Sequence, residues 1–407
     1  MIEIKEKKNC CGCEACYNAC PVQCISMERD EEGFKYPCVD TTKCIGCNKC
    51  EKVCPCIHKP YINKQYIEGY AAINKNLKER LNSSSGGIFS LLATKIIELG
   101  GVVIGSTMTD DCKEAMHIIV DNAEELNCLY GSKYLQSNIN NIYSEVYEKL
   151  RNDKWVLFSG TPCQVEGLLN YLGNPYEKLI CVDLICHGVP SPGIWKKHVE
   201  NIEKKKHLKL KNVNFRCKKY NGYSDYGIMY QKSFYKSKEE DTYFQLFMKE
   251  LTLRLSCYDC KFKGIVRNSD ITLGDFWGID DFAADLNDGN GTSIVVIQSE
   301  KGKKLFEEIK QSLALTTVEV DKVFATHNDA MTKSSLKPDN REAFWNDFHK
   351  LSYEQLCKKY IHISSKEKIK SVLRKIGVLE KIQKIREGGG VTSNNNFGML
   401  YIFKDND

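Results

Sequence analysis

The chain has 407 residues, of which 42% are hydrophobic and 27% charged, a balance typical of a globular protein with two or three domains. Its formal net charge of +5 is mild for this length and gives no case for nucleic-acid binding. The sequence has no run of about eighteen apolar residues and no apolar leader, so we expect a cytoplasmic protein without a transmembrane segment.

Cysteines dominate the first sixty residues. The chain contains 21 cysteines, and 12 of them lie at or before Cys56. In a reducing compartment this load indicates metal ligands rather than disulfides. Two runs share the spacing C-x2-C-x2-C-x3-C-P, offset by 34 residues: Cys10, Cys13, Cys16 and Cys20, then Cys44, Cys47, Cys50 and Cys54. This spacing is typical of two-cluster bacterial ferredoxins, in which the fourth cysteine of each run ligates the other cluster.

We therefore predict a ferredoxin domain over residues 1–60 with two 4Fe-4S clusters. One cluster would be held by Cys10, Cys13, Cys16 and Cys54, and the other by Cys44, Cys47, Cys50 and Cys20. Zinc is the weaker alternative, because zinc modules separate two C-x2-C pairs by a long spacer. Cys11, Cys24, Cys38 and Cys56 lie off the pattern and are interpreted as small buried residues beside the clusters.

After a linker over residues 61–80, two segments have the composition of phosphate-binding loops. The stretch NSSSGG, with Ser85, Gly86 and Gly87, precedes an apolar-periodic helix that runs to about Leu99. Free backbone N–H groups at such a helix start bind phosphate, although a simple capped helix explains the pattern equally well. The loop YGSKYLQS offers Ser132 and Lys133, with a solvated turn as the alternative.

Two strand–cysteine–helix units follow. A strand over residues 155–158 leads to Cys163, and a strand over residues 179–185 leads to Cys186. They imply a mixed or parallel sheet with cysteines on one rim. A C-x2-C pair, Cys257 and Cys260, then precedes a further strand. These four thiols would form a third cluster site if the fold brings them together, and spacing alone leaves structural thiols as an alternative.

In this order, the dicluster pattern, SSSGGIFS, GSKYLQS, FSGTPCQ, CHGVPSP, CYDCKFKG and SDITLGDFWGI resemble the coenzyme F-420 hydrogenase/dehydrogenase beta subunit family. The resemblance covers about residues 1–350. It implies a flavin-binding α/β domain over residues 81–350, FAD as cofactor, and a third 4Fe-4S cluster on Cys163, Cys186, Cys257 and Cys260. The FAD contacts that it implies are Ser85, Gly86, Gly87, Ser132 and Lys133, with Arg267, Asp270, Gly274 and Asp275 near the same pocket.

The expected function is therefore that of an oxidoreductase in which electrons pass from ferredoxin or another redox protein through the clusters to FAD and a small-molecule substrate. His187 would donate a proton to substrate or bond a cluster sulfur, or only orient its loop. The substrate is organic or of deazaflavin type, and the motifs do not identify it. The alternatives are an electron-transfer subunit serving a separate catalytic chain, and a protein whose FAD site has decayed.

Residues 351–407 are expected to form a helical, basic segment with a loose tail. Apolar residues at helical spacing, among them Ile369, Leu373 and Ile376, lie opposite lysines and arginines. This face would cover the core, dock a partner or contact an anionic membrane surface.

Overall fold

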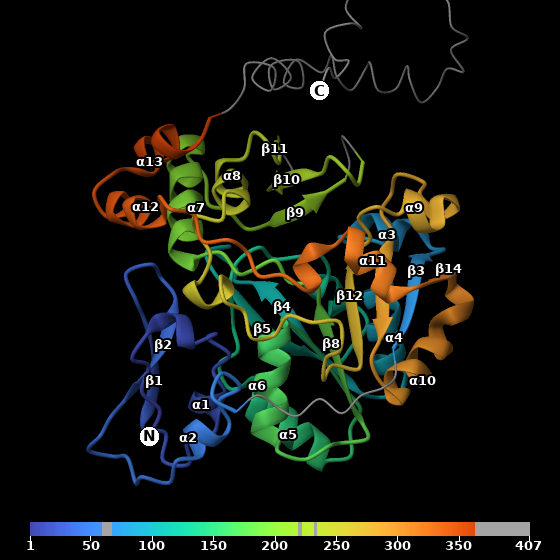
Figure 1. Ribbon diagram of the computed structural model, residues 1–407, viewed down its shortest axis with the longest axis horizontal. Helices are drawn as coiled ribbons and strands as arrows, with labels where there is room; N and C mark the ends of the chain where they lie inside the picture. Colours follow the sequence, from blue (N-terminus) through green and yellow to red (C-terminus); the bar gives the residue numbers. More distant parts are fainter. Residues whose placement is uncertain (59–66, 219–221, 232–233, 363–407) are drawn as a thin grey trace, which may run out of the picture. The chain divides into compact units, whose positions relative to one another are not determined.

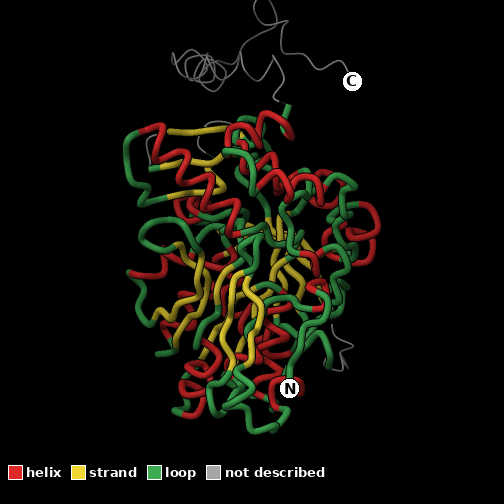
Figure 2. The backbone as a smooth tube through the Cα atoms, turned by 90° about the vertical axis from the view of Figure 1, so that its left-hand side faces the viewer, coloured by secondary structure: helices red, strands yellow, loops and turns green. Residues whose placement is uncertain are grey.

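The computed structural model describes residues 1–58, 67–218, 222–231 and 234–362. Its centre is a nine-stranded mixed sheet (Figures 1 and 2). In sheet order the strands are β14 (Leu313–Val318), β3 (Glu68–Asn74), β13 (Ser293–Ile297), β12 (Ile271–Asp275), β8 (Leu179–Leu184), β7 (Val156–Gly160), β4 (Val102–Met108), β5 (Ala115–Val120) and β6 (Ser137–Asn138).

The inner strands are parallel to one another. β12, β8, β7 and β4 pair in parallel, and β3 has the same direction because it is antiparallel to β13, which is antiparallel to β12. These strands are short apolar runs, as expected for strands covered on both faces. The carboxyl ends of five strands therefore meet at one edge of the sheet, which confirms the predicted mixed sheet with cysteines on one rim.

Helices cover both faces of the sheet. On one face α4 (Ile88–Glu98) and α10 (Glu300–Ile309) pack through Leu92, Ile96 and Phe306. On the other face lie α5 (Ile142–Arg151) and α6 (Pro162–Leu172), which bury Val146 and Leu168 against the strands. The shorter helices are α3 (Leu77–Asn82), α9 (Asp280–Ala283) and α11 (Val320–Thr326).

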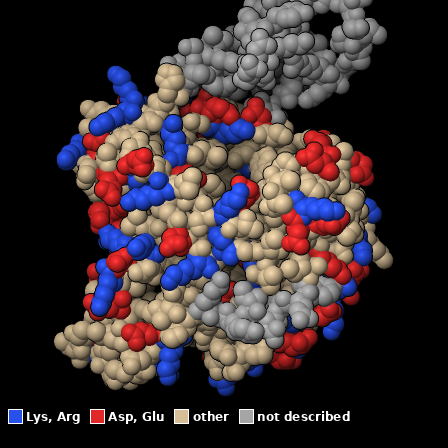
Figure 3. Space-filling view, viewed as in Figure 1, with Lys and Arg blue, Asp and Glu red and all other residues tan. Residues whose placement is uncertain are grey.

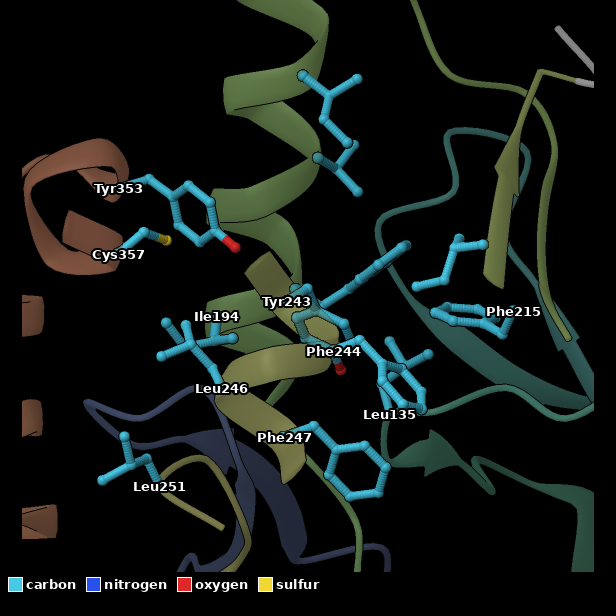
Figure 4. Close-up of a cluster of buried hydrophobic side chains, with 14 of the residues drawn as sticks. Leu135, Ile194, Phe215, Tyr243, Phe244, Leu246, Phe247, Leu251, Tyr353 and Cys357 are labelled. Atoms are coloured by element: carbon cyan, nitrogen blue, oxygen red, sulfur yellow. The ribbon is translucent and has the colours of Figure 1, made fainter. Parts of the chain in front are cut away.

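A second layer stands beyond the carboxyl edge of the strands. It consists of a three-stranded antiparallel sheet and four helices: β9 (Val213–Cys217), β10 (Gly227–Tyr230), β11 (Phe234–Ser237), α7 (Pro192–Lys206), α8 (Thr242–Met248), α12 (Arg341–Phe348) and α13 (Tyr353–Tyr360). Its core is aromatic, with Tyr243, Phe244 and Phe247 of α8 packing toward Phe215 of β9 (Figure 4). α7 begins with Ser191, whose hydroxyl accepts from the Ile194 N–H at 3.1 Å, and Pro192.

The N-terminal cysteine runs lie on short loops around a small hairpin of β1 (Ile25–Arg29) and β2 (Lys35–Val39), with α1 (Ala15–Asn18) and α2 (Lys49–Lys52). We call residues 1–58 the ferredoxin lobe. Residues 1–361 form one compact unit, so the lobe is packed on the α/β part rather than tethered to it. Cys11, Cys13 and Ala15 enter the same core cluster as α5 and α6.

Part of the segment expected as a linker is structural. Residues 68–74 form β3, which pairs with β13 on one side and β14 on the other, and α3 follows directly. The strand EGYAAIN has polar residues at both ends and only a short apolar stretch between them, which gave little sign of this. The predicted basic helix after residue 362 lies outside the described residues. Among the described residues, no helix has the length and apolar character needed to cross a membrane.

Candidate functional site

The carboxyl edge of the parallel strands collects most of the predicted site residues. Cys163 follows β7, Cys186 follows β8, Asp275 ends β12, and the NSSSGG loop lies between β3 and α4. In open α/β sheets the crevice outside the carboxyl ends of the strands is where ligands bind. Neighbouring strands lie about 4.8 Å apart, so positions two or three strands apart on this edge are separated by roughly 10–14 Å.

Four distant cysteines converge at this edge. Cys163, Cys186, Cys257 and Cys260 line a single cavity. Burial, and to a smaller extent the neighbouring Cys163 and Cys260 thiols, raise the pKa of Cys186 to about 11 against the opposing charge of Lys263. Burial and then the Cys186 thiol raise the pKa of Cys257. The four thiols are therefore electrostatic neighbours, and a metal group bound there would displace their protons.

The same cavity reaches the ferredoxin lobe. Cys11 and Cys56, two of the cysteines off the ligand pattern, also line it. Hydrogen bonds from Cys11 and then from Thr161 lower the pKa of Cys163 to about 7. Of the four cysteines off the pattern, Cys11 and Cys24 are buried and Cys56 is half-buried, whereas Cys38 is exposed on β2, so the expectation of a buried residue is wrong for Cys38.

Each N-terminal run is joined by the fourth cysteine of the other run. Burial raises the pKa of Cys16, and the nearby Cys10 and Cys54 thiols raise it further, so Cys54 lies with the first run. Cys20 lines a second cavity together with Cys44, Cys47 and Cys50. Among the described residues, no three cysteine, histidine or acidic side chains stand close enough to hold a single metal ion.

Two of the predicted FAD contacts, Ser85 and Gly86, make hydrogen bonds that hold the NSSSGG loop against the sheet. The Ser85 hydroxyl donates to the Thr292 carbonyl at 2.7 Å, and the Gly86 N–H donates to the Ser293 hydroxyl at 2.9 Å. A Cβ at Gly86 would lie 2.4 Å from the Ala72 carbonyl, so only glycine fits this approach to the strands. Gly87 caps α4 with φ of +81°.

The loop side chain that faces the second motif is Ser84. Its hydroxyl lies 2.9 Å from that of Ser132 and accepts from the Ser132 N–H at 2.7 Å. Lys133 turns back on its own loop, donating to the Cys128 and Tyr130 carbonyls at 3.0 Å each. Burial lowers the pKa of Lys133 to about 7.

Arg216 of β9 connects the motifs, although sequence reasoning did not single it out. Its guanidinium donates to the Ser84 carbonyl at 3.2 Å and to the Tyr134 hydroxyl at 3.2 Å, and it pairs with Asp275 at 2.9 Å. Its Nε and the hydroxyl of nearby Tyr223 are both buried without a hydrogen-bond partner among the described residues. An acceptor-rich ligand at this place would satisfy both donors.

Lys218, two residues after Arg216, also contacts the NSSSGG loop. Its ammonium donates to the carbonyls of Ser85 at 2.8 Å, Asn290 at 2.8 Å and Arg80 at 3.1 Å. Burial, and then the charge of Arg216, lower the pKa of Lys218 to about 7. Arg216 and Lys218 therefore place basic groups directly beside the NSSSGG loop.

The remaining predicted contacts do not all meet here. Gly274 and Asp275 lie at the carboxyl end of β12, where a Cβ on Gly274 would lie 2.5 Å from Ile185. Asp270 lies at the opposite end, about 16 Å away at 3.3 Å per residue, where it accepts from the Cys181 N–H at 2.8 Å. Arg267 pairs with Asp183 at 3.1 Å and lines the cysteine cavity.

His187 also lines the cysteine cavity. Its Nε2 lies 3.1 Å from the Glu250 carboxylate, and its ring meets Phe247 edge-on. Burial lowers the pKa of His187. The neutral imidazole is therefore the favoured form beside the thiols.

Two family models match the chain. Residues 153–323 match the model for the C terminus of the "Coenzyme F420 hydrogenase/dehydrogenase, beta subunit", and residues 9–57 match "4Fe-4S dicluster domain". Residues 153–323 are thus a domain of the coenzyme F420 hydrogenase/dehydrogenase beta subunit type, and they follow a 4Fe-4S dicluster domain. A solved structure of the F420-reducing [NiFe] hydrogenase complex from Methanosarcina barkeri is similar over 73% of this chain and 92% of its own, at 16% identity and a TM-score of 0.43. No curated protein sequence matches the chain.

The dicluster match confirms that the N-terminal cysteines belong to a 4Fe-4S domain. The F420 hydrogenase/dehydrogenase match spans Cys163, Cys186, Cys257 and Cys260 together with Arg216 and Asp275. It leaves the NSSSGG loop and Ser132 outside its limits. The protein is thus an iron–sulfur electron-transfer protein of an oxidoreductase family.

Proposed function

We propose that the protein is an iron–sulfur flavoprotein oxidoreductase that exchanges electrons between 4Fe-4S clusters and FAD and reduces or oxidises an organic or deazaflavin-type substrate. The observation that carries this proposal is the shared position of two groups of residues on one sheet edge. One group is the thiol set Cys163, Cys186, Cys257 and Cys260, which suits a third cluster. The other is the loop with Ser84, Ser132, Arg216 and Asp275, which suits FAD.

The second group has the chemistry that a dinucleotide cofactor requires. The start of α4 has no side-chain cap, and the basic flank of Arg216 and Lys218 lies beside it. Such a site favours a diphosphate. Trp277, 40% exposed and stacked on Tyr223 with ring centroids 5.3 Å apart, offers an aromatic face to a flat ring.

When bound, the clusters carry single electrons and the flavin supplies hydride or single-electron exchange. The chain contributes positioning. Cys11 and Cys56 of the ferredoxin lobe line the cysteine cavity. The strands β12 and β8 are adjacent, with Asp275 at the end of β12 and Cys186 just after the end of β8. This arrangement supports a path from the lobe through the third thiol set to the FAD site.

The far end of the ferredoxin lobe suits a redox partner. Cys47 is exposed, and Ile45 and Val22 beside it are 64% and 39% exposed. The lower left of Figure 3, where the lobe lies, is largely free of charged side chains. We propose that ferredoxin or another redox protein exchanges electrons with the chain there. This surface also favours the second candidate function, an electron-transfer subunit that serves a separate catalytic chain.

Anaerobic purification followed by iron, sulfide and flavin analysis tests the proposal. We expect about twelve irons and one FAD per chain. The variant Cys257→Ser should lower iron to about eight. Cys357→Ser, at a buried cysteine of α13 that lines neither cysteine cavity, should leave it at about twelve. Wild-type protein with about eight irons and no flavin, prepared anaerobically, would overturn the proposal.

A further inference from the structure

Arg254 differs from the other buried arginines of the protein. In the part of the chain that the structure describes, five arginines are less than 5% exposed: Arg80, Arg216, Arg254, Arg267 and Arg341. Four of them pair with a carboxylate, namely Asp288, Asp275, Asp183 and Glu32 respectively. Arg254 is fully buried, and no carboxylate oxygen of the described residues lies within 4.0 Å of its guanidinium. An unpaired buried cation is costly, so its environment calls for an anion.

The surroundings of Arg254 consist of carbonyls, sulfur and two aromatic rings, those of Tyr36 and Phe34, whose centroids lie 4.2 and 5.3 Å from the guanidinium carbon. Its Nε donates to the Cys10 carbonyl at 2.8 Å and its Nη2 to the Lys35 carbonyl at 3.0 Å. Its Nη1 donates to the Gln136 side-chain oxygen at 2.9 Å. The remaining contact is from Nη2 to the Cys10 Sγ at 3.5 Å. Neutral carbonyls orient the guanidinium but supply no counter-charge. The Glu14 carboxylate, whose pKa burial raises and the charges of Lys35 and Arg254 lower in part, interacts with it from beyond 4.0 Å.

Thiols of both cysteine groups interact electrostatically with the guanidinium of Arg254. Besides Cys10, the charge of Arg254 interacts with Cys257 and Cys163. Gly12 makes the approach of the lobe possible, because a Cβ there would lie 2.8 Å from Nη1, and its φ is +71°. The guanidinium therefore lies between the first N-terminal thiol group and the thiols of the cavity.

We propose that Arg254 is the shared counter-cation of two 4Fe-4S clusters and raises the reduction potential of both. One is the cluster of Cys10, Cys13, Cys16 and Cys54; the other is the cluster of Cys163, Cys186, Cys257 and Cys260, and for it the inference rests on the proposed function. Reduction adds an electron to a core that is already anionic. A buried positive charge and an N–H group directed at a ligand sulfur stabilise the reduced form more than the oxidised form.

The same placement reduces the repulsion between two neighbouring anionic clusters. Without the cation, adding an electron to one cluster would make the next electron harder to place on the other, since the medium between them is of low dielectric. Arg254 is a positioning residue in this sense. It acts on the clusters through charge and orientation and touches no substrate.

Redox titration followed by EPR spectroscopy of individual clusters tests this role in the full chain. Arg254→Gln, which keeps an amide donor but removes the charge, should shift the potentials of both clusters to more negative values. Arg254→Lys should give a smaller shift. The control is the double variant Arg341→Gln with Glu32→Gln, which removes a guanidinium at the same lobe boundary together with the carboxylate that neutralises it; because the net charge is unchanged, it should leave both potentials unchanged.

Unchanged potentials in an Arg254→Gln protein with its full iron content would overturn the inference. If that variant loses iron, Arg254→Lys decides: retention of iron with potentials near wild type supports a charge role, and equal loss in both variants refutes it. Iron analysis distinguishes failure of the proposed third cluster from failure of the role proposed for Arg254. A wild-type protein with only about eight irons would remove the third cluster, while the shift for the N-terminal cluster would still test Arg254.

Discussion

Single basic side chains determine the charge of the proposed FAD site. Burial, and secondarily Arg216, lower the pKa of Lys218 to about 7 from its usual 10.5. In the folded protein without FAD, the Lys218 side chain is therefore mostly charged below pH 7 and mostly neutral above it, whereas an ordinary lysine stays charged up to about pH 10.5. An anionic diphosphate favours the charged form, so FAD binding should take up a proton in this window. We expect FAD affinity to fall as pH rises through 7, by at most about tenfold per pH unit.

Fluorescence titration of the apoprotein with FAD at several pH values measures this dependence. Lys218→Met should bind more weakly at pH 6 and show a flatter profile above pH 7. The matched control is Lys197→Met, since burial also lowers the pKa of Lys197 but its ammonium donates to the Phe348 and Leu351 carbonyls. An unchanged slope in Lys218→Met would assign the dependence to another group.

At the scale of elements, the cap of α6 positions a predicted cluster ligand. Thr161 and Gln164 form a capping box, and the Thr161 hydroxyl lies 3.2 Å from the Cys163 Sγ. Thr161→Val keeps the shape but removes the hydroxyl, and should cost about 1 kcal/mol of unfolding free energy. It should also lower the iron content of the third site, as measured by denaturant unfolding and iron analysis under anaerobic conditions.

Thr161→Ser restores the hydroxyl and should recover both quantities. If Thr161→Val loses stability but keeps its full iron content, the cap supports only the helix. A structural cap elsewhere gives a second control: Ser352→Ala at the capping box of α13 should lower stability by a similar amount and leave iron unchanged.

Elements such as α6 also show what local sequence can predict. Ligand spacing and short apolar runs are local signals, so the two cysteine runs and the strand–cysteine–helix units were predictable. Arg216 and Arg254 were not, because their partners Ser84 and Cys10 are 132 and 244 residues away. Asp270 and Asp275 lie close in sequence but at opposite ends of β12, which only the strand bounds reveal.

At the scale of the whole molecule, the ferredoxin lobe is fixed by buried contacts. Glu32 of the lobe pairs with Arg341 at 2.8 Å, and the Ser191 hydroxyl at the start of α7 donates to the Glu32 carbonyl. Glu14 accepts from the Asn140 N–H at 2.8 Å. The thiols of the lobe therefore keep a fixed distance from those of the cavity, as a relay requires.

The turn at Gly33 allows a test of this docking without touching a cysteine. A Cβ at Gly33, whose φ is +87°, would lie 2.5 Å from the Gly193 N, so Gly33→Ala should push the lobe away from α7. Gly100→Ala is the matched control, because its φ of +69° imposes similar backbone strain and a Cβ there meets nothing within 4 Å. We expect Gly33→Ala to keep its N-terminal clusters but to slow the reduction of the third cluster in freeze-quench EPR, while Gly100→Ala keeps the wild-type rate. Equal rates in both variants would mean that the lobe need not be docked for electrons to pass.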